Sequence, residues 1–296
     1  MFVKVCDEMT LLCFTKKKGA NNLKKLERKR NSKMKKWMGG LFTSALLLGM
    51  AACGTADETQ GEASGDGGTQ EEAQEISVAV VQDYPPFEYI VDGDLTGFDI
   101  DIIEAIAAEE NLKVNWEIMR FDGIIPALQA NQVDAAVSAI TIREDRAEVV
   151  DFSQPYFESG LSLVVPVDSD INSIEDLEGA QIVGKQGTSG LEKAREFAEQ
   201  YNGDVTVLQE DATMYMEILS GNADALVNDY PSVAYKITTD GDDTKLRIVG
   251  ERLTGEDYGI AVSKGADGLL EKMDNGLSTI MENGTYDEIY NQYFGE

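Results

Sequence analysis

The sequence contains no histidine and only three cysteines, which limits the catalytic groups, metal sites and disulfides that it can form. Without histidine, a catalytic acid or base has to be Asp, Glu, Lys or Tyr. Cys6 and Cys13 lie near the start and the third cysteine is Cys53, so a Cys and His zinc site has poor support. We therefore expect no metal, no cofactor and, if the mature chain begins at Cys53, no internal disulfide.

Basic residues are scarce after residue 52. Residues 1–52 hold 12 Lys or Arg and 3 Asp or Glu, whereas residues 53–296 hold 13 basic and 51 acidic residues. Such an acidic body repels nucleic acid and anionic membrane surfaces, so we expect no nucleic-acid partner. The acidity favours solubility, and attraction of cationic solutes is the alternative interpretation.

A short apolar stretch precedes Cys53. Two lysines are followed by the apolar run 37–52, which ends in small residues and is too short to span a membrane comfortably. The string M-A-A-C-G around Cys53 resembles a bacterial lipobox, in which the cysteine is lipidated, although Met50 stands where Leu is usual. We expect a lipoprotein signal peptide at 34–52 and a lipid anchor on Cys53, which places the exported protein at the outer face of the cell membrane.

The segments on either side of this signal lack the composition of a folded domain. Residues 1–33 are basic, and we interpret them as a gene-model extension with Met34 as the true start. After the lipidated cysteine, the rest of segment 53–75 has no aromatic or large aliphatic residue. It cannot bury enough apolar area to offset chain ordering, so we expect a disordered tether with a reach of roughly 25 Å.

From Ile76 onward, strand-like and helix-like segments alternate, which predicts an α/β fold. A buried parallel strand is expected at 76–81, and an amphipathic helix should bury Ile102, Ile103, Ile106 and Ala107. Further strands are expected at 114–118, 134–140, 161–165, 181–184, 205–209, 223–227, 246–249 and 258–262. Further helices are expected at 122–129, 174–177, 191–200, 213–220 and 232–238, with two more at the end of the chain.

The most informative stretch is I-T-I-R-E-D-R-A-E-V-V-D-F-S-Q-P-Y-F-E-S-G at 140–160. Thr141 and Glu144 have capping-box spacing, which predicts a short helical turn that begins at Thr141. Taken alone, Arg146 in this turn is an ordinary surface arginine. The strings P-F-E, G-F-D, G-I-I-P-A-L, D-F-S, E-N-G-T-Y and E-I-Y accompany it in order. Together they make the chain from Ile76 to Phe294 resemble the extracellular solute-binding proteins of family 3, which capture polar amino acids for ABC importers.

The resemblance implies a two-lobe periplasmic binding protein-like type II fold with the ligand in a cleft between the lobes. Lobe 1 is expected to be discontinuous, at 76–156 plus 258–296, with lobe 2 inserted at 157–257. The two crossings are expected near 156–160 and 253–257. The implied partners are an amino acid and an ABC transporter permease, and nothing in the sequence indicates an obligate oligomer, so we expect a monomer.

The resemblance also implies roles for the residues that match the family pattern. Arg146 matches the arginine that forks onto the ligand's α-carboxylate, as a planar guanidinium does well. Thr141 matches a threonine that assists it, and the Ala139 carbonyl matches an acceptor for the ammonium group. Asp229 matches the aspartate that takes the same ammonium, and Tyr84 and Phe121 match an aromatic pair around the side chain. Each assignment has a structural alternative. Thr141 could be a plain helix cap, Asp229 could cap a turn, and the two aromatic residues could belong to the core.

The side-chain end of the expected site departs from the glutamine-binding members, which the chain otherwise resembles most. Asn228 stands where those members have histidine, and Ser189 replaces a glycine. Val81 stands where they have aspartate, although Asp83 lies nearby in the sequence and could partly substitute for it. The turn K-Q-G-T-S-G, from Lys185 through Thr188 and Ser189, enters a helix, so its free N–H groups suit a carboxylate.

We expect glutamine first as the ligand, another polar amino acid second, and arginine or lysine third. Two other functions stay open. One is a cyclohexadienyl (arogenate or prephenate) dehydratase-like enzyme on the same fold, for which we find no acid or base beyond the binding set. The other is an amino-acid sensor module. Our prediction is a binding protein that performs no catalysis.

Overall fold

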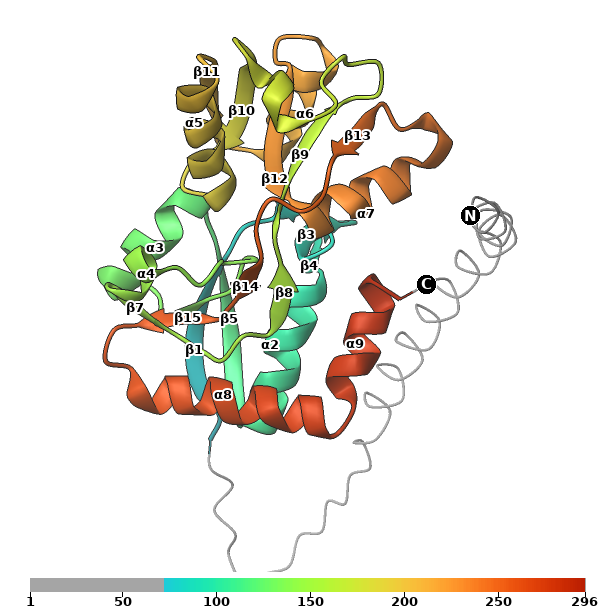
Figure 1. The fold of residues 1–296 in the computed structure, drawn as a ribbon. Helices are drawn as coiled ribbons and strands as arrows, with labels where there is room; N and C mark the ends of the chain where they lie inside the picture. Colours follow the sequence, from blue (N-terminus) through green and yellow to red (C-terminus); the bar gives the residue numbers. More distant parts are fainter. Residues whose placement is uncertain (1–71, 296) are drawn as a thin grey trace, which may run out of the picture. The chain divides into compact units, whose positions relative to one another are not determined.

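The computed structural model describes residues 72–295 (Figure 1). The expected extension 1–33, the signal peptide 34–52, Cys53 and most of the tether 53–75 lie outside the described residues. Within 72–295, no helix has both the length and the apolar character needed to cross a membrane.

The first sheet is mixed and has the strand order β5-β1-β6-β15-β7. Its strands are β1 (Gln74–Val80), β5 (Leu112–Ile118), β6 (Ala135–Ala136), β7 (Val150–Phe152) and β15 (Ala261–Ser263). Strand β1 runs parallel to β5 and β6, whereas β15 runs antiparallel to β6 and β7. This sheet belongs to the first lobe, which also contains a small three-stranded sheet of β2 (Asp83–Tyr84), β3 (Glu88–Val91) and β4 (Asp94–Thr96). Its helices are α2 (Phe98–Glu109), α3 (Phe121–Gln129), α4 (Glu144–Ala147), α8 (Asp267–Glu282) and α9 (Thr285–Tyr293).

The second sheet is also mixed and has the order β11-β10-β12-β9-β13. Its strands are β9 (Leu161–Pro166), β10 (Gln181–Lys185), β11 (Asp204–Leu208), β12 (Ala225–Asp229) and β13 (Leu246–Val249). Strands β10, β11 and β12 are parallel, and β9 runs antiparallel to both β12 and β13. The helical elements of this lobe are η1 (Ile174–Leu177), α5 (Ser189–Gln200), α6 (Asp211–Leu219), α7 (Tyr230–Asp240) and η2 (Gly241–Asp243). The predicted α/β class is confirmed, with one mixed sheet in each lobe.

Two chain segments cross between the lobes, and they pair with each other. Strand β8 (Phe157–Ser159) carries the chain out of the first lobe, and β14 (Glu256–Tyr258) brings it back. The two strands are antiparallel neighbours, with Phe157 opposite Tyr258 and Ser159 opposite Glu256. After β14 the chain returns to the first sheet through β15 and ends in α8 and α9 beside α2 (Figure 1).

Packing of the first lobe follows the apolar pattern of the sequence. Ile102, Ile103, Ile106 and Ala107 are all buried on α2, as predicted. Helix α8 approaches α2 closely at Gly276, where a Cβ atom would lie only 2.7 Å from the Ile106 side chain.

Aromatic rings gather where the crossings meet the first lobe. The Phe87 ring lies 5.1 Å from Phe157 and 5.4 Å from Tyr258, one on each crossing strand, and 5.6 Å from Phe294. Tyr84 stacks on Phe87 at 6.0 Å. Edge-on and offset contacts of this kind are favourable ring geometries, so Phe87 links both crossings to one packed core.

Several local predictions differ from the structure. The expected strand 258–262 is divided between β14 and β15, which belong to different sheets. The expected strand 134–140 shortens to β6, because the backbone turns left-handed at Ala139, with φ 46°, and its N–H donates to the Asp99 carboxylate. The capping box at Thr141 was wrong: α4 begins at Glu144 with Arg143 as its N-cap, and Thr141 instead pairs with Tyr258 in an isolated bridge. Strand β1 begins two residues earlier than expected, within the segment assigned to the tether.

Candidate functional site

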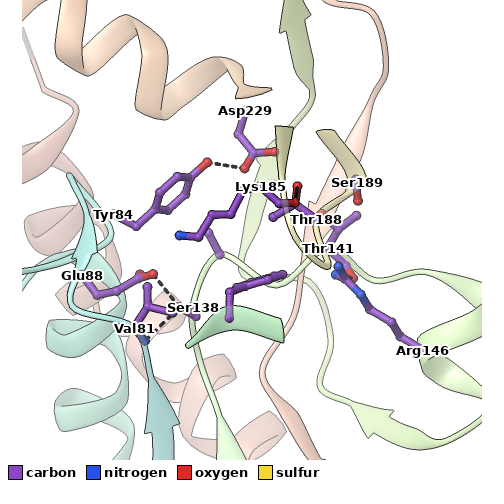
Figure 2. Close-up of a pocket in the computed structure, with 12 residues that line it drawn as sticks. Val81, Tyr84, Glu88, Ser138, Thr141, Arg146, Lys185, Thr188, Ser189 and Asp229 are labelled. Atoms are coloured by element: carbon purple, nitrogen blue, oxygen red, sulfur yellow. Dashed lines mark hydrogen bonds between the residues drawn. The ribbon is translucent and has the colours of Figure 1, made fainter. Parts of the chain in front are cut away.

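A small cavity lies where the two lobes face each other. Figure 2 shows most of its wall in sticks. Both lobes contribute, and the lining residues are Val81, Tyr84, Glu88, Phe121, Ser138, Ala139, Thr141, Arg146, Lys185, Thr188, Ser189 and Asp229. Nine of the eleven predicted ligand contacts are in this wall; Asp83 and Asn228 are the two that are not.

Arg146 comes from the short helix α4 and is only 5% exposed. Its guanidinium donates to the Thr141 carbonyl at 2.8 Å and to the Gly187 carbonyl of the second lobe at 3.0 Å. Its Cζ lies 5.5 Å from the centre of the Phe121 ring. Burial lowers the pKa of Arg146 to about 10, which leaves the group a cation at neutral pH. Its polar contacts are with carbonyls, and none of the ion pairs in residues 72–295 includes it.

Asp229 ends β12, at the carboxyl edge of the second sheet, and precedes α7. The Tyr84 hydroxyl donates to its Oδ2 across the gap between the lobes (Figure 2). Burial raises the pKa of Asp229 to about 7, and the charges of Glu256 and Asp211 act in the same direction against the Tyr84 hydrogen bond. Like Arg146, Asp229 takes part in no ion pair among the described residues.

Lys185 lies between the two aromatic side chains that we expected to enclose the ligand. Its ammonium is 5.3 Å from the Tyr84 ring centre and 5.9 Å from that of Phe121. Asp211 pairs with it at 2.5 Å, both side chains are nearly inaccessible, and Asp83 lies 3.7 Å away. Burial acts to lower the pKa of Lys185, but the two carboxylates outweigh it, so the pKa is raised and the side chain is charged.

The remaining predicted residues have local roles that the structure defines. Thr141 donates from Oγ1 to Glu256 at 3.0 Å, while its carbonyl accepts from Arg146. Thr188 caps α5, since its Oγ1 accepts from the Leu191 N–H at 3.2 Å. Ser189 begins the same helix, and its buried hydroxyl has no hydrogen-bond partner among residues 72–295.

Asn228 and Asp83 lie behind the cavity wall. Asn228 precedes Asp229 in β12 and is not one of the residues that line the cavity. Asn228 accepts from the Tyr84 hydroxyl at 3.2 Å and donates weakly toward Asp211 at 3.4 Å. Asp83 faces Lys185. Both residues therefore support side chains of the wall.

Sequence reasoning missed three wall residues as ligand contacts: Val81, Glu88 and Ser138. Val81 was noted only as a departure from the family aspartate. Glu88 belongs to the string P-F-E, and Ser138 directly precedes Ala139; these were the only signals available. Glu88 is completely buried, and the Ser138 hydroxyl donates to it at 2.6 Å.

The cavity has the chemistry of a binding site for a small molecule with both charges. Within residues 72–295, no group of three or more His, Cys, Asp or Glu side chains is arranged to hold a metal ion. The wall instead offers one unpaired cation, one carboxyl group poised near neutrality, two rings, and the free N–H groups at the start of the twelve-residue helix α5.

Comparison with known proteins gives consistent similarities. Residues 76–296 match the model of the bacterial extracellular solute-binding proteins, family 3. The ABC transporter glutamine-binding protein GlnH of Bacillus subtilis (strain 168) is 31% identical over 281 residues, which cover 88% of this chain and 98% of that protein. A probable histidine-binding protein of Neisseria gonorrhoeae is 29% identical over 266 residues, 89% of this chain and 97% of that protein.

Solved structures show the same likeness. An ancestral arginine-binding protein bound to arginine is 38% identical, with a TM-score of 0.72, and the match covers 76% of this chain and all of that one. All three of these proteins are named for binding and none for catalysis.

Proposed function

The chain belongs to the bacterial extracellular solute-binding proteins of family 3, and from this premise we propose that it captures a polar amino acid for an ABC importer. Its fold is the two-lobe periplasmic binding protein type II fold of the related structures. In this proposal the protein is exported and held at the outer face of the membrane by lipidated Cys53. It then delivers its ligand to a membrane permease.

One observation carries the proposal: Arg146 and Asp229 line the same cavity from opposite lobes, and neither has an ionic partner among the described residues. A free amino acid carries a carboxylate and an ammonium group a short distance apart. Leaving either charge buried and unpaired costs several kcal/mol. A zwitterion satisfies Arg146 and Asp229 together, whereas a simple anion or cation satisfies only one.

Glutamine is our proposed ligand. The Lys185 ammonium stands between Tyr84 and Phe121, so a ligand with a cationic side chain meets a like charge there. A neutral amide instead offers an oxygen that accepts from Lys185 and has no net charge to bury. The name of the Bacillus subtilis relative agrees with this choice.

A thermal-shift panel of the twenty L-amino acids tests the proposal. We expect a large stabilisation by glutamine or by one or two other polar amino acids, since a ligand that binds only the folded state stabilises it. Arg146→Ala and Asp229→Ala should nearly abolish the shift. Arg195→Ala and Asp204→Ala, which change exposed charges of the second lobe, serve as matched controls and should keep it. If the first two variants respond like the wild type, the assigned site is wrong.

The two alternative functions have direct tests. A dehydratase would release an aromatic product from arogenate or prephenate, and we expect none. Glu88 adds a carboxyl group to the wall, but it is completely buried and accepts a hydrogen bond from the Ser138 hydroxyl. A sensor module would leave amino-acid uptake intact when the gene is deleted, whereas the importer proposal predicts a loss of uptake.

A further inference from the structure

Two completely buried carboxyl groups, Glu88 and Asp99, lie beside the cavity without an assigned role. Glu88 begins β3, and Asp99 is the second residue of α2. Both groups contact the segment Ser138-Ala139, which forms part of the cavity wall. Buried carboxyl groups are costly, so their hydrogen bonds show what they do.

Donors are distributed unequally over the four carboxyl oxygens. Asp99 accepts from the Ala139 N–H at 2.7 Å and from the Tyr156 hydroxyl at 2.9 Å, one donor on each oxygen. Glu88 accepts the Ser138 hydroxyl at 2.6 Å on Oε1, but its buried Oε2 receives no donor from the described residues. If Glu88 keeps its proton and donates it to Asp99, the unpaired oxygen is explained.

The electrostatics agree with this assignment. Burial raises the pKa of Glu88 well above its ordinary value, and the negative charge of Asp99 adds to the effect. Burial also raises the pKa of Asp99, to about 6, against the hydrogen bonds from Ala139, Tyr156 and Glu88. Both pKa shifts have the direction expected if the pair shares one proton and Glu88 is the group that keeps it.

The contacts of the pair fix a strained piece of backbone. Ala139 has a φ of 46°, a left-handed conformation that an alanine adopts only when its surroundings hold it there. The Ala139 N–H donates to Asp99, and the hydroxyl of the preceding Ser138 donates to Glu88. The same hydroxyl accepts from the Val81 N–H at 3.3 Å. Val81, Ser138 and Ala139 all line the cavity.

We propose that Glu88 and Asp99 form a proton-sharing pair that positions Ser138 and Ala139, and with them the Ala139 carbonyl, for the ligand's ammonium group. This inference rests on the proposed function, because it assigns the pair to amino-acid binding. Both carboxyl groups are positioning residues: they act through the backbone that they hold.

The groups that face the pair set the direction of its pH response. Lys185 on β10 favours the charged form of Glu88, but it is already paired with Asp211. The hydroxyls of Tyr156, Tyr258 on β14 and Tyr286 on α9 stay neutral, because their pKa values are raised. As the pH rises through the pKa of Glu88, two adjacent buried negative charges form, and the Ser138-Ala139 segment loses its support.

Isosteric amide substitutions separate this role from simple packing. Glu88→Gln keeps an oxygen for Ser138 and places an N–H donor toward Asp99, so L-glutamine should bind within about threefold of wild type. Asp99→Asn turns a donor toward Ala139 or Tyr156, and Glu88→Ala leaves Ser138 unpaired. Both should weaken binding at least about tenfold. Glu117→Gln, an exposed change on β5, is the control and should behave like wild type.

Calorimetric titration with L-glutamine, and with L-arginine and L-histidine as second probes, gives these affinities. Carbon-13 spectra of the glutamate carboxyl groups, without ligand, test the pair itself. One carboxyl signal should remain protonated at pH 7, vanish in Glu88→Gln, and titrate together with the Ala139 amide signal.

Equal binding by Glu88→Gln, Glu88→Ala and Asp99→Asn overturns the inference, and so does a Glu88 carboxyl that is ionised at pH 7. If Asp99→Asn does not fold, the two Glu88 variants and the spectra still decide. If wild type binds no amino acid, the proposed function fails, while the spectra separately report whether the pair exists.

Discussion

Lowering the pH from 8 to 6 should weaken amino-acid binding about tenfold, through Asp229 alone. Burial raises the pKa of this carboxyl group to about 7 in the free protein, whereas an ordinary aspartate has a pKa of about 3.9. Asp229 must be ionised to pair with an ammonium group. At pH 8 nearly every molecule has the ionised form, and at pH 6 only about one in ten has it.

The sign of the effect follows from linkage. Because the ligand selects the ionised form, binding lowers the pKa of Asp229 and releases a proton in the pH range around 7. Near pH 7 about half a proton should leave for each ligand bound, since half of the free protein is protonated. Acid weakens binding in this interval, and alkali up to pH 8 strengthens it.

Calorimetric titration at pH 6, 7 and 8 measures the affinity, and repetition in buffers of different ionisation enthalpy measures the released protons. Asp229→Asn is the control: it should bind weakly, and most of the response between pH 6 and 8 should disappear. Asp99, with a pKa of about 6, also titrates in the lower part of this interval, and its contribution is what remains of the response in Asp229→Asn. Equal affinities at pH 6 and 8, or binding without proton release, would refute the assignment of Asp229 to the ammonium.

Three further changes give distinct outcomes. Arg146→Ala should weaken amino-acid binding by at least about a hundredfold in calorimetry, because it removes the partner of the ligand's buried carboxylate, a loss of roughly 3–5 kcal/mol. Arg146→Lys should recover only part of this affinity, since an ammonium group cannot donate two parallel hydrogen bonds to a carboxylate. Lys185→Met should lower the free energy of unfolding by roughly 3–5 kcal/mol in urea titration, because Asp211 loses its partner, and the further change Asp211→Leu should restore most of it. Phe87→Ala should cost roughly 3–5 kcal/mol in the same assay, since the ring is fully buried between both crossings; a loss below about 1 kcal/mol would contradict that packing.

Periodicity and local strings predicted most of the architecture because they reflect burial. The buried face of α2 follows the spacing of Ile102, Ile103 and Ile106, and the apolar run 161–165 becomes the buried strand β9. Local spacing predicted the wrong contact where a residue distant in the sequence offered a competing hydrogen-bond partner. Thr141 has the sequence of a cap, but the returning strand β14 offers it Tyr258 as a bridge partner and Glu256 as an acceptor. Separation in the sequence hides that competition.

The family pattern predicted which single residues line the site. It did not predict side-chain positions that depend on partners distant in the sequence. Arg146 and Asp229 were expected in one cleft, and they line one cavity. That Lys185 lies between Tyr84 and Phe121 depends on Asp211, which draws the ammonium inward from α6. Burial of a glutamate is rare, so membership of the string P-F-E was too weak a signal to place Glu88 in the wall.

The energetics of the gap between the lobes favour a ligand-driven closure. At the rim, Arg143 of the first lobe pairs with Glu192 of the second at 2.7 Å, but Glu192 is 56% exposed. Such a pair contributes about 0–1 kcal/mol, too little to hold two lobes together. Other polar contacts across the gap include those of Arg146 with the Gly187 carbonyl and of the Tyr84 hydroxyl with Asp229 and Asn228, and Lys185 lies 3.7 Å from Asp83. A ligand stabilises one arrangement only through contacts it makes there and not elsewhere. Because its two charged partners belong to different lobes, a zwitterion gains both contacts only when the lobes close.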